Sequence, residues 1–369
     1  MARKRRPAAA PRPPVRRSLD EPRDDDVELF DHPDGPHLVI DYTAGGLPIG
    51  VPYEPIREEF VADARRSGAG WAIARDAMLR ALRAAVGRDA RVEVGRVTHL
   101  GRGLSRHAYR ADVEVDCENP SGFVALVPAH DADADLPDRV MREQRLLSHL
   151  SRLDLPFRVP RPVAIVSMDD LVLVEEELLG VGVDMRAGVQ PTVRPWDVLA
   201  SVAGAVHRIE PPSDLPGHAT RRAHALADAR VFGQLDDPLA AVAHAWIEHH
   251  LPPDTPASLV HGDLLGKNVL IAPDQPPGVI DWEYARRGDP AYELAILTRG
   301  ARRPFELPRG LDKLVCAYRA AGGEVCAEDV RVYELCLVGR WLAEALRARN
   351  AHEITMHRAA LERLLGPAA

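Results

Sequence analysis

Lysine is almost absent from this sequence of 369 residues. Lysine and arginine together number 47, but lysine occurs only at Lys4, Lys267 and Lys313. Alanine and proline are abundant. We interpret the preference for arginine over lysine, like this abundance, as a genomic bias rather than a functional one. It nevertheless restricts the chemistry, because a site that ordinarily uses a lysine must use one of these three residues or an arginine.

Other absences exclude whole classes of protein. The four cysteines are widely spaced and form no C-x-x-C pair, which argues against a disulfide framework and against a zinc site. No apolar run approaches the roughly 18 residues of a membrane helix, and no apolar segment follows the basic N-terminus as in a secretory signal. The net charge is −8, and the body of the chain lacks the excess of basic residues that is typical of nucleic-acid-binding proteins. We expect a cytoplasmic monomer or homodimer whose partners include neither nucleic acid nor a membrane.

The first 90 residues form two regions of different composition. Residues 1–28 are basic and then acidic, with too little apolar surface to fold, so we predict a disordered tail. A nucleic-acid- or partner-binding arm is the alternative. Residues 29–90 are predicted to form an N-terminal extension, with a strand over 37–42 and one amphipathic helix that ends at Gly87. The apolar positions of this helix recur every three or four residues: Trp71, Ala74, Met78, Leu82 and Ala85.

The rest of the chain changes from strand-like to helical patterns near residue 179. Residues 91–178 contain three runs with partial alternation (VEVGRVTHL, RHAYRADVEV and GFVALVP), a helical segment over 138–153 and two further strands, RPVAIVS and LVLVEEE. Strands followed by helices predict an α+β protein with two lobes, 91–178 and 179–369. In the second lobe we expect amphipathic helices at 196–209, 238–250, 307–321, 329–349 and 353–365.

One segment, 259–295, alternates apolar strands with polar loops in an order that suggests chemistry. Its sequence is LVHGDLLGKNVLIAPDQPPGVIDWEYARRGDPAYELA, with Asp263 and Asn268 in the first loop and Asp281 at the end of a strand. Phosphoryl transfer requires a carboxylate that accepts the proton of the attacking hydroxyl, and hard oxygen ligands that hold Mg²⁺ against nucleotide phosphates. We therefore predict Asp263 as the base, and Asn268 and Asp281 as magnesium ligands. The alternative is that these residues only cap turns.

The same segment resembles the aminoglycoside phosphotransferase-like kinases, including the choline kinase-like enzymes. The resemblance rests on H-G-D-x-x-x-x-N at 261–268, on I-D-W-E at 280–283 and on the following G-D-P, with Glu293 where aspartate is usual. It extends over about 94–341 and implies a protein-kinase-like bilobal fold, with a small antiparallel-sheet N-lobe and a mainly helical C-lobe. It also implies transfer of the γ-phosphate of Mg-ATP to a hydroxyl of a small molecule. In this resemblance His261 holds the loop by hydrogen bonds.

The resemblance assigns further residues upstream. A kinase N-lobe has a glycine-rich hairpin whose backbone N–H groups approach the phosphates. Glu143 lies where the family has a helix glutamate that pairs with a basic residue of the third strand. ATP and GTP both remain open as the nucleotide. Residues of this chain at the family's nucleotide-binding places are Gly101, Gly103 and Ser105 in the hairpin, and Glu176 and Leu178, whose backbone would meet adenine.

The chain departs from the family at the third strand, where the expected basic residue falls near Leu126 and no lysine lies in the lobe. We predict that Arg106 replaces it and that Glu143 loses its usual partner. A missing cation would weaken the stabilisation of a charged ligand. It keeps open a second hypothesis, a nucleotide-binding pseudokinase that acts as a regulatory or interaction module. A protein kinase is disfavoured because the second motif reads D-W-E rather than D-F-G. Other arginines considered are Arg102, Arg110 and Arg142.

The phosphate acceptor is not specified by any motif. In the resembling family it contacts the helical lobe, here residues 211–253 and the helices after Pro304. Acidic side chains in these regions could receive a cationic substrate such as an amino sugar or a choline-like amine, although solvated helix faces explain them equally well. They are Asp236, Asp237, Glu248, Glu324, Glu334 and Glu344.

Overall fold

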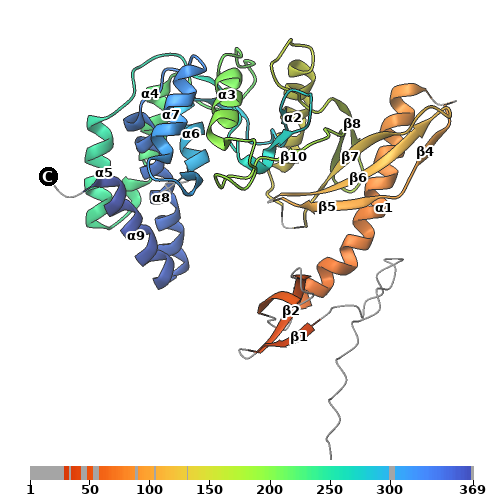
Figure 1. The fold of residues 1–369 in the computed structure, drawn as a ribbon, viewed down its shortest axis with the longest axis horizontal. Helices are drawn as coiled ribbons and strands as arrows, with labels where there is room; N and C mark the ends of the chain where they lie inside the picture. The colour runs from red at the N-terminus through yellow and green to blue at the C-terminus, as the bar shows by residue number, and fades with distance from the viewer. Residues whose placement is uncertain are drawn as a thin grey trace, which may run out of the picture. The chain divides into compact units, whose positions relative to one another are not determined.

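The protein is described by a computed structural model, shown in Figure 1. It describes residues 29–32, 35–42, 48–52, 58–87, 90–103, 105–130, 132–298 and 304–366, with side chains from Gly70 onward. The tail predicted over 1–28 lies outside these ranges. The chain forms two compact units, Met1–Gly68 and Ala69–Ala369. The boundaries predicted at 28, 90 and 178 stay predictions.

The first unit contains a three-stranded antiparallel sheet in the order β1-β2-β3. The strands are β1 (Leu29–His32), β2 (Gly35–Tyr42) and β3 (Pro48–Pro52). β2 confirms the strand predicted over 37–42, but its two neighbours were not predicted. β1 has only four residues, and Pro and Gly interrupt the pattern of β3.

The second unit begins within a long helix, α1 (Glu58–Val86), that is longer than predicted. Ala74, Met78 and Leu82 are buried against the main sheet, as the spacing predicted. Trp71 is 37% exposed and Ala85 is also exposed, so the prediction that they belong to the buried face was wrong. The buried stripe runs through Ala77 and Ala81 instead, whose small side chains allow close approach to the sheet.

The main sheet has six antiparallel strands in the order β4-β6-β7-β9-β8, with β5 also paired to β6. Alternation divides its residues between two faces. Tyr109, Ala125 and Val174 pack on α1, while Leu173 joins the core on the side of helix α2 (Leu136–Leu150). The run VEVGRVTHL forms two strands rather than the one predicted, because Gly95 separates them. The strands are β4 (Val92–Val94), β5 (Thr98–Arg102), β6 (Arg106–Val115), β7 (Ser121–Pro128), β8 (Pro162–Ser167) and β9 (Leu171–Glu176).

The remainder of this unit is mainly helical, and Figure 1 shows these helices at the other end of the unit from the sheet. The five helices predicted there are confirmed within a few residues at each end. α4 was not predicted. The helices are α3 (Pro195–His207), α4 (Arg221–Ala229), α5 (Pro238–His249), α6 (Pro290–Thr298), α7 (Gly310–Ala320), α8 (Ala327–Ala348) and α9 (Ala351–Leu365).

Two small sheets are built from short strands, four of which lie between α5 and α6 along the chain. β11 (Ser258–Val260) pairs with β14 (Arg286–Gly288), and β10 (Val181–Gly182), β12 (Val269–Ile271) and β13 (Gly278–Val279) form the other. The loops that follow β11 and β13 carry the residues predicted to be catalytic. The α+β bilobal prediction is therefore confirmed. Within the described residues, no helix is both long and apolar enough to cross a membrane.

Candidate active site

The loop after β11 turns sharply at Gly262, which has a φ of +84°. A Cβ atom at this position would lie 2.4 Å from the backbone oxygen of Tyr284. Only glycine tolerates both the left-handed backbone and this contact. The turn places Asp263 three residues after β11, whose last two residues, Leu259 and Val260, are fully buried in the core.

Glu293 holds the backbone of this loop from below. It lies in the first turn of α6, is fully buried, and accepts hydrogen bonds from the backbone N–H groups of His261, Gly262 and Leu264. Burial alone would raise the pKa of Glu293, but His207, His261 and the backbone donors lower it below its usual value. The glutamate that stands in place of the usual aspartate therefore stabilises the loop as an ionised anchor.

His261 connects the two loops of the site. Its Nε2 atom donates to the backbone oxygen of Ile280 at 3.0 Å, and its Nδ1 atom accepts from the N–H of Asp263 at 3.3 Å. Its ring lies on Trp282, with 4.6 Å between ring centroids. These contacts orient the ring between the two loops. The geometry is that of a structural histidine.

Asn268 lies at the end of a short 3₁₀ turn, Gly266–Asn268, and is buried. Its Nδ2 group donates to the backbone oxygen of Asp263 at 2.8 Å and to Asp263 Oδ2 at 3.2 Å. The predicted base and the predicted metal ligand are therefore in direct contact. Lys267, one of the three lysines, has its Nζ atom 4.0 Å from Asp263 Oδ2 and is 63% exposed.

Asp281 follows β13 with a φ of +70°, a conformation that non-glycine residues rarely adopt. The strained backbone turns its carboxylate away from the strand, and Oδ1 lies 3.4 Å from the Nη2 atom of Arg106. Unusual backbone of this kind is concentrated at functional sites. The geometry brings the two predicted magnesium ligands to adjacent segments, since the N–H of Ile280 donates to the backbone oxygen of Asn268 at 3.0 Å.

Arg106 forms a buried ion pair with Glu143. Its Nη1 atom lies 2.5 Å from Glu143 Oε2, and its Nη2 atom 3.3 Å from Glu143 Oε1. The expectation that Glu143 loses its partner was wrong. Ala108 on β6 pairs with Leu126 on β7, so an arginine two residues before Ala108 lies on the same face as the position of the absent lysine.

The guanidinium of Arg106 is surrounded by acids. Its Nε atom lies 3.6 Å from Glu283 Oε2, in addition to the contacts with Glu143 and Asp281. Burial alone would lower the pKa of Arg106, but these three carboxylates raise it well above its usual value. Glu143 also accepts from the N–H of Trp282 at 3.1 Å. One pair thus ties β6, α2 and the loop after β13 together.

A cavity of about 370 Å³ opens between the main sheet and the loops after β11 and β13. Its lining includes seven of the predicted site residues; Gly101, Glu143, His261 and Asp263 are outside the lining. Ser105 donates its hydroxyl to Glu283 at 2.6 Å and so joins the hairpin to the loop after β13. The predicted residues that line the cavity are Gly103, Ser105, Arg106, Glu176, Leu178, Asn268 and Asp281.

The side chains at the cavity fit a magnesium ion bound with nucleotide. Asn268 donates its Nδ2 group to Asp263, so its Oδ1 atom is left for a cation. The described residues offer no hydrogen-bond donor to Oδ1 of Asn268 or to Oδ2 of Asp281. One amide and one carboxylate oxygen suit Mg²⁺, because phosphates and water fill its other positions. No cluster of three or more His, Cys, Asp or Glu residues able to hold a metal occurs in the described part of the chain.

Sequence reasoning missed three acidic residues of the site: Glu175, Glu283 and Glu293. Glu283 was quoted in the D-W-E motif without a role, although the motif itself was the signal. Glu293 was noted only as a departure from aspartate. Glu175 was given no role, but it is buried and lines the cavity. Its burial could have been predicted from strand alternation, because Glu175 shares a face of its strand with the apolar residues Leu171 and Leu173.

Known structures share this fold. APH(2")-IIia, solved with GDP and kanamycin, is 18% identical, with a TM-score of 0.53 over 78% of this chain and 97% of that one. Macrolide 2'-phosphotransferase MphH from Brachybacterium faecium is 21% identical, with a TM-score of 0.54 over 78% of this chain and 98% of that one. Aminoglycoside phosphotransferase APH(4)-Ia, solved with AMP-PNP and hygromycin B, is 18% identical, with a TM-score of 0.53 over 78% of this chain and 96% of that one.

Among proteins of assigned function, homoserine kinase from Rhizobium meliloti (strain 1021) is 37% identical over 76 residues. The match spans 21% of this chain and only 23% of that enzyme. A much longer match comes from the model of the phosphotransferase enzyme family (APH), which covers residues 60–335. The chain therefore belongs to the phosphotransferase enzyme family, as the motifs at 261–268 and 280–283 predicted.

Proposed function

We propose that the chain transfers the γ-phosphate of Mg-ATP to a hydroxyl group of a small molecule. The observation that carries this proposal is the convergence of Arg106 with Asn268 and Asp281, from two neighbouring loops more than 150 residues later in the chain, on one cavity. Phosphoryl transfer depends mainly on positioning and on the neutralisation of charge. A cation and hard oxygen ligands beside a glycine-containing hairpin provide both.

Asp263 is the proposed base. The hydrogen bond from Asn268 orients its carboxylate. The hydrogen bonds that Glu293 accepts from the loop backbone hold the loop against α6. A hydroxyl that donates to Asp263 would be aligned for attack and would lose its proton to the same oxygen. Bound Mg²⁺ would supply charge neutralisation of the phosphates. The roles of Asn268 and Asp281 in this scheme are to hold that ion through their free oxygens.

Arg106 is the proposed partner of the nucleotide phosphates, with Glu143 as the residue that positions it. Arginine suits this role because its planar fork binds carboxylate on one side and leaves N–H groups for phosphate on another. The pseudokinase hypothesis rested on a missing cation. Arg106 supplies that cation within the cavity, and no other observation favours the pseudokinase.

The acceptor is proposed to be a small hydroxylated compound, in keeping with the kanamycin, hygromycin B, macrolide and homoserine enzymes to which the chain is similar. Two of the acids considered for a cationic substrate are already engaged. Asp237 pairs with Arg358 at 2.7 Å, and Glu334 is buried and accepts from Thr298. The other four are exposed at the surface.

The test is transfer of labelled γ-phosphate to a panel of aminoglycosides, macrolides, homoserine and choline. The variant Asp263→Asn is compared with Asp274→Asn, a control in the adjoining exposed turn, where asparagine tolerates the positive φ of 57°. We expect transfer by the wild type and the control, and a fall of about 10²–10⁴-fold in Asp263→Asn. Transfer at the wild-type rate by Asp263→Asn would show that another group is the base.

A further inference from the structure

Glu175 is a buried acid without a partner. It lies on β9, is 6% exposed, and within the described residues no group donates a hydrogen bond to its carboxyl. Its oxygens are not among the fully enclosed unpaired atoms of the described residues, so they meet solvent only through the cavity. A partly desolvated acid that no protein group pairs calls for an explanation. Nearby acids do have partners: Glu176 pairs with Arg161, and Glu177 pairs with Arg110 at 3.0 Å.

The carboxyl of Glu175 opens into the cavity rather than into the core. Val172 and Val174 pack on the α1 side of the sheet, and Leu173 lies on the opposite side with α2. Alternation therefore directs Glu175 to the same side as Leu173. There it lines the cavity and interacts electrostatically with Glu143, Arg106 and Asp281.

We propose that Glu175 selects the nucleobase by hydrogen bonding to the group on C6 of a purine ring and to the ring nitrogen beside it. The inference rests on the proposed function, because it needs the nucleotide to occupy this cavity. Glu175 directly precedes Glu176 and stands three residues before Leu178, which line the same cavity. Within the described residues no backbone carbonyl accepts from the N–H of Leu178, so this group is left to meet a base as well.

The protonation of Glu175 determines which base it suits. Burial, and then the charge of Glu143, raise the pKa of Glu175 to about 8, so the group is mostly neutral at pH 7. A neutral carboxyl offers one donor beside one acceptor. Adenine carries an amino donor on C6 with an acceptor nitrogen on each side of it, so it matches a neutral carboxyl in either orientation. Guanine carries a carbonyl on C6 beside a protonated ring nitrogen and also matches a neutral carboxyl there, whereas a purine with only hydrogen on C6 loses one of the two hydrogen bonds.

The experiment measures binding of three magnesium nucleotides at pH 7 by calorimetry: ADP, GDP and purine riboside diphosphate, which has only hydrogen on C6. Glu175→Leu removes both hydrogen bonds, whereas Glu175→Gln keeps one donor and one acceptor. Glu114→Gln, on β6 outside the cavity, is the matched control. Glu175→Leu is expected to fold, because an apolar side chain of similar size replaces a carboxyl that the protein leaves unsatisfied.

In the wild type, ADP and GDP should both bind more tightly than purine riboside diphosphate. The preference for ADP over purine riboside diphosphate should fall by about fivefold or more in Glu175→Leu and persist in Glu175→Gln and Glu114→Gln. An unchanged preference in Glu175→Leu, or a loss in Glu175→Gln as large as in Glu175→Leu, would overturn the inference and leave the proposed function standing. Absence of any nucleotide binding by the wild type would overturn both.

Discussion

Arg106 and Glu143 form a buried ion pair, with the Nη1 atom of Arg106 2.5 Å from Oε2 of Glu143. Both side chains are at most 5% exposed. The arginine comes from the start of β6 rather than from the neighbouring strand β7, where Leu126 stands at the place of the family's basic residue. The pair nevertheless connects the sheet to α2 and faces Asp281. The cation that pairs with Glu143 is thus an arginine of β6 and not a residue of β7.

The first prediction concerns this ion pair. Arg106→Leu should destabilise the fold by about 3–5 kcal/mol, because it leaves Glu143 buried and unpaired. It should also abolish binding of Mg-ATP. The double variant Arg106→Leu/Leu126→Lys restores a cation on the adjacent strand and should recover part of both losses. Stability is measured by urea unfolding and binding by calorimetry.

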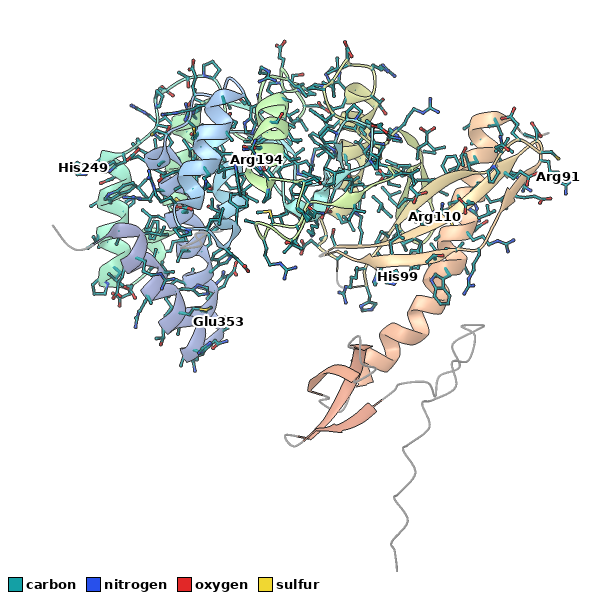
Figure 2. The ribbon with its side chains drawn as sticks, viewed as in Figure 1. Arg91, His99, Arg110, Arg194, His249 and Glu353 are labelled. Atoms are coloured by element: carbon teal, nitrogen blue, oxygen red, sulfur yellow. The ribbon has the colours of Figure 1, made fainter. Side chains whose placement is uncertain are left out.

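Arg110 provides the control for this prediction. It lies on the same strand and is labelled in Figure 2, and it pairs with Asp112 and Glu177 near the surface. Arg110→Leu should cost less than about 1 kcal/mol. Recovery of neither stability nor binding in the double variant would show that the strand position, and not only the charge, is essential.

The second prediction concerns the anchor of the catalytic loop. Glu293→Gln removes the charge that accepts three backbone N–H groups, so it should reduce stability at neutral pH by about 1–3 kcal/mol. It should lower kcat more than it changes nucleotide affinity. The folded pKa of Glu293 is depressed, so its contribution is present above pH 4.5 and lost as pH falls through the folded pKa.

The stability difference between wild type and Glu293→Gln should therefore narrow below pH 4.5. Denaturant unfolding at several pH values checks this, with Glu362→Gln on the exposed face of α9 as the control. A difference that stays constant down to pH 3 would mean that Glu293 is not ionised in the folded protein.

The third prediction concerns Glu175, whose contribution to stability should be lost as pH rises rather than as pH falls. Its folded pKa of about 8 lies above the unfolded value of 4.5, so the folded state retains a proton that the unfolded chain releases. Stability should fall as pH rises between these values, by up to about 1.4 kcal/mol for each pH unit. Glu175→Gln lacks this effect and should gain stability relative to the wild type from pH 5 to pH 8.

Unfolding free energies of wild type, Glu175→Gln and Glu114→Gln across this range provide the measurement. A constant difference between wild type and Glu175→Gln would place the carboxyl in contact with water rather than in a buried pocket.

Local patterns in the sequence predicted much of the fold. The stripe of α2 and the amphipathic helices after residue 179 were visible because their burial follows the period of a helix. The motif at 261–268 located the catalytic loop, because all of its residues lie within one short segment and can be recognised without knowledge of the tertiary structure. The first sheet, β1 to β3, was predicted only in its middle strand, where apolar residues run without interruption.

The partners of buried charges could not be predicted. Glu143 lies within the buried stripe of α2, which shows that it needs a cation, but strand pairing decides which arginine reaches it. Arg106 is 37 residues away, and its place relative to Leu126 depends on the register of β6 and β7. In the same way, nothing local connects Glu293 to Gly262, 31 residues before it.

The proposal that this cavity binds Mg-ATP is tested most directly by thermal unfolding with and without the complex, in the wild type and in Asp281→Asn. Asparagine removes the charge and tolerates the positive φ of this position better than alanine. A ligand at a hundredfold excess over its Kd adds about 2.7 kcal/mol, or roughly 4 °C for a protein of this size. The account predicts such a rise in Tm in the wild type only when magnesium is present, and none in Asp281→Asn. An equal rise in both proteins would contradict the metal site, and no rise in the wild type would contradict the nucleotide site itself.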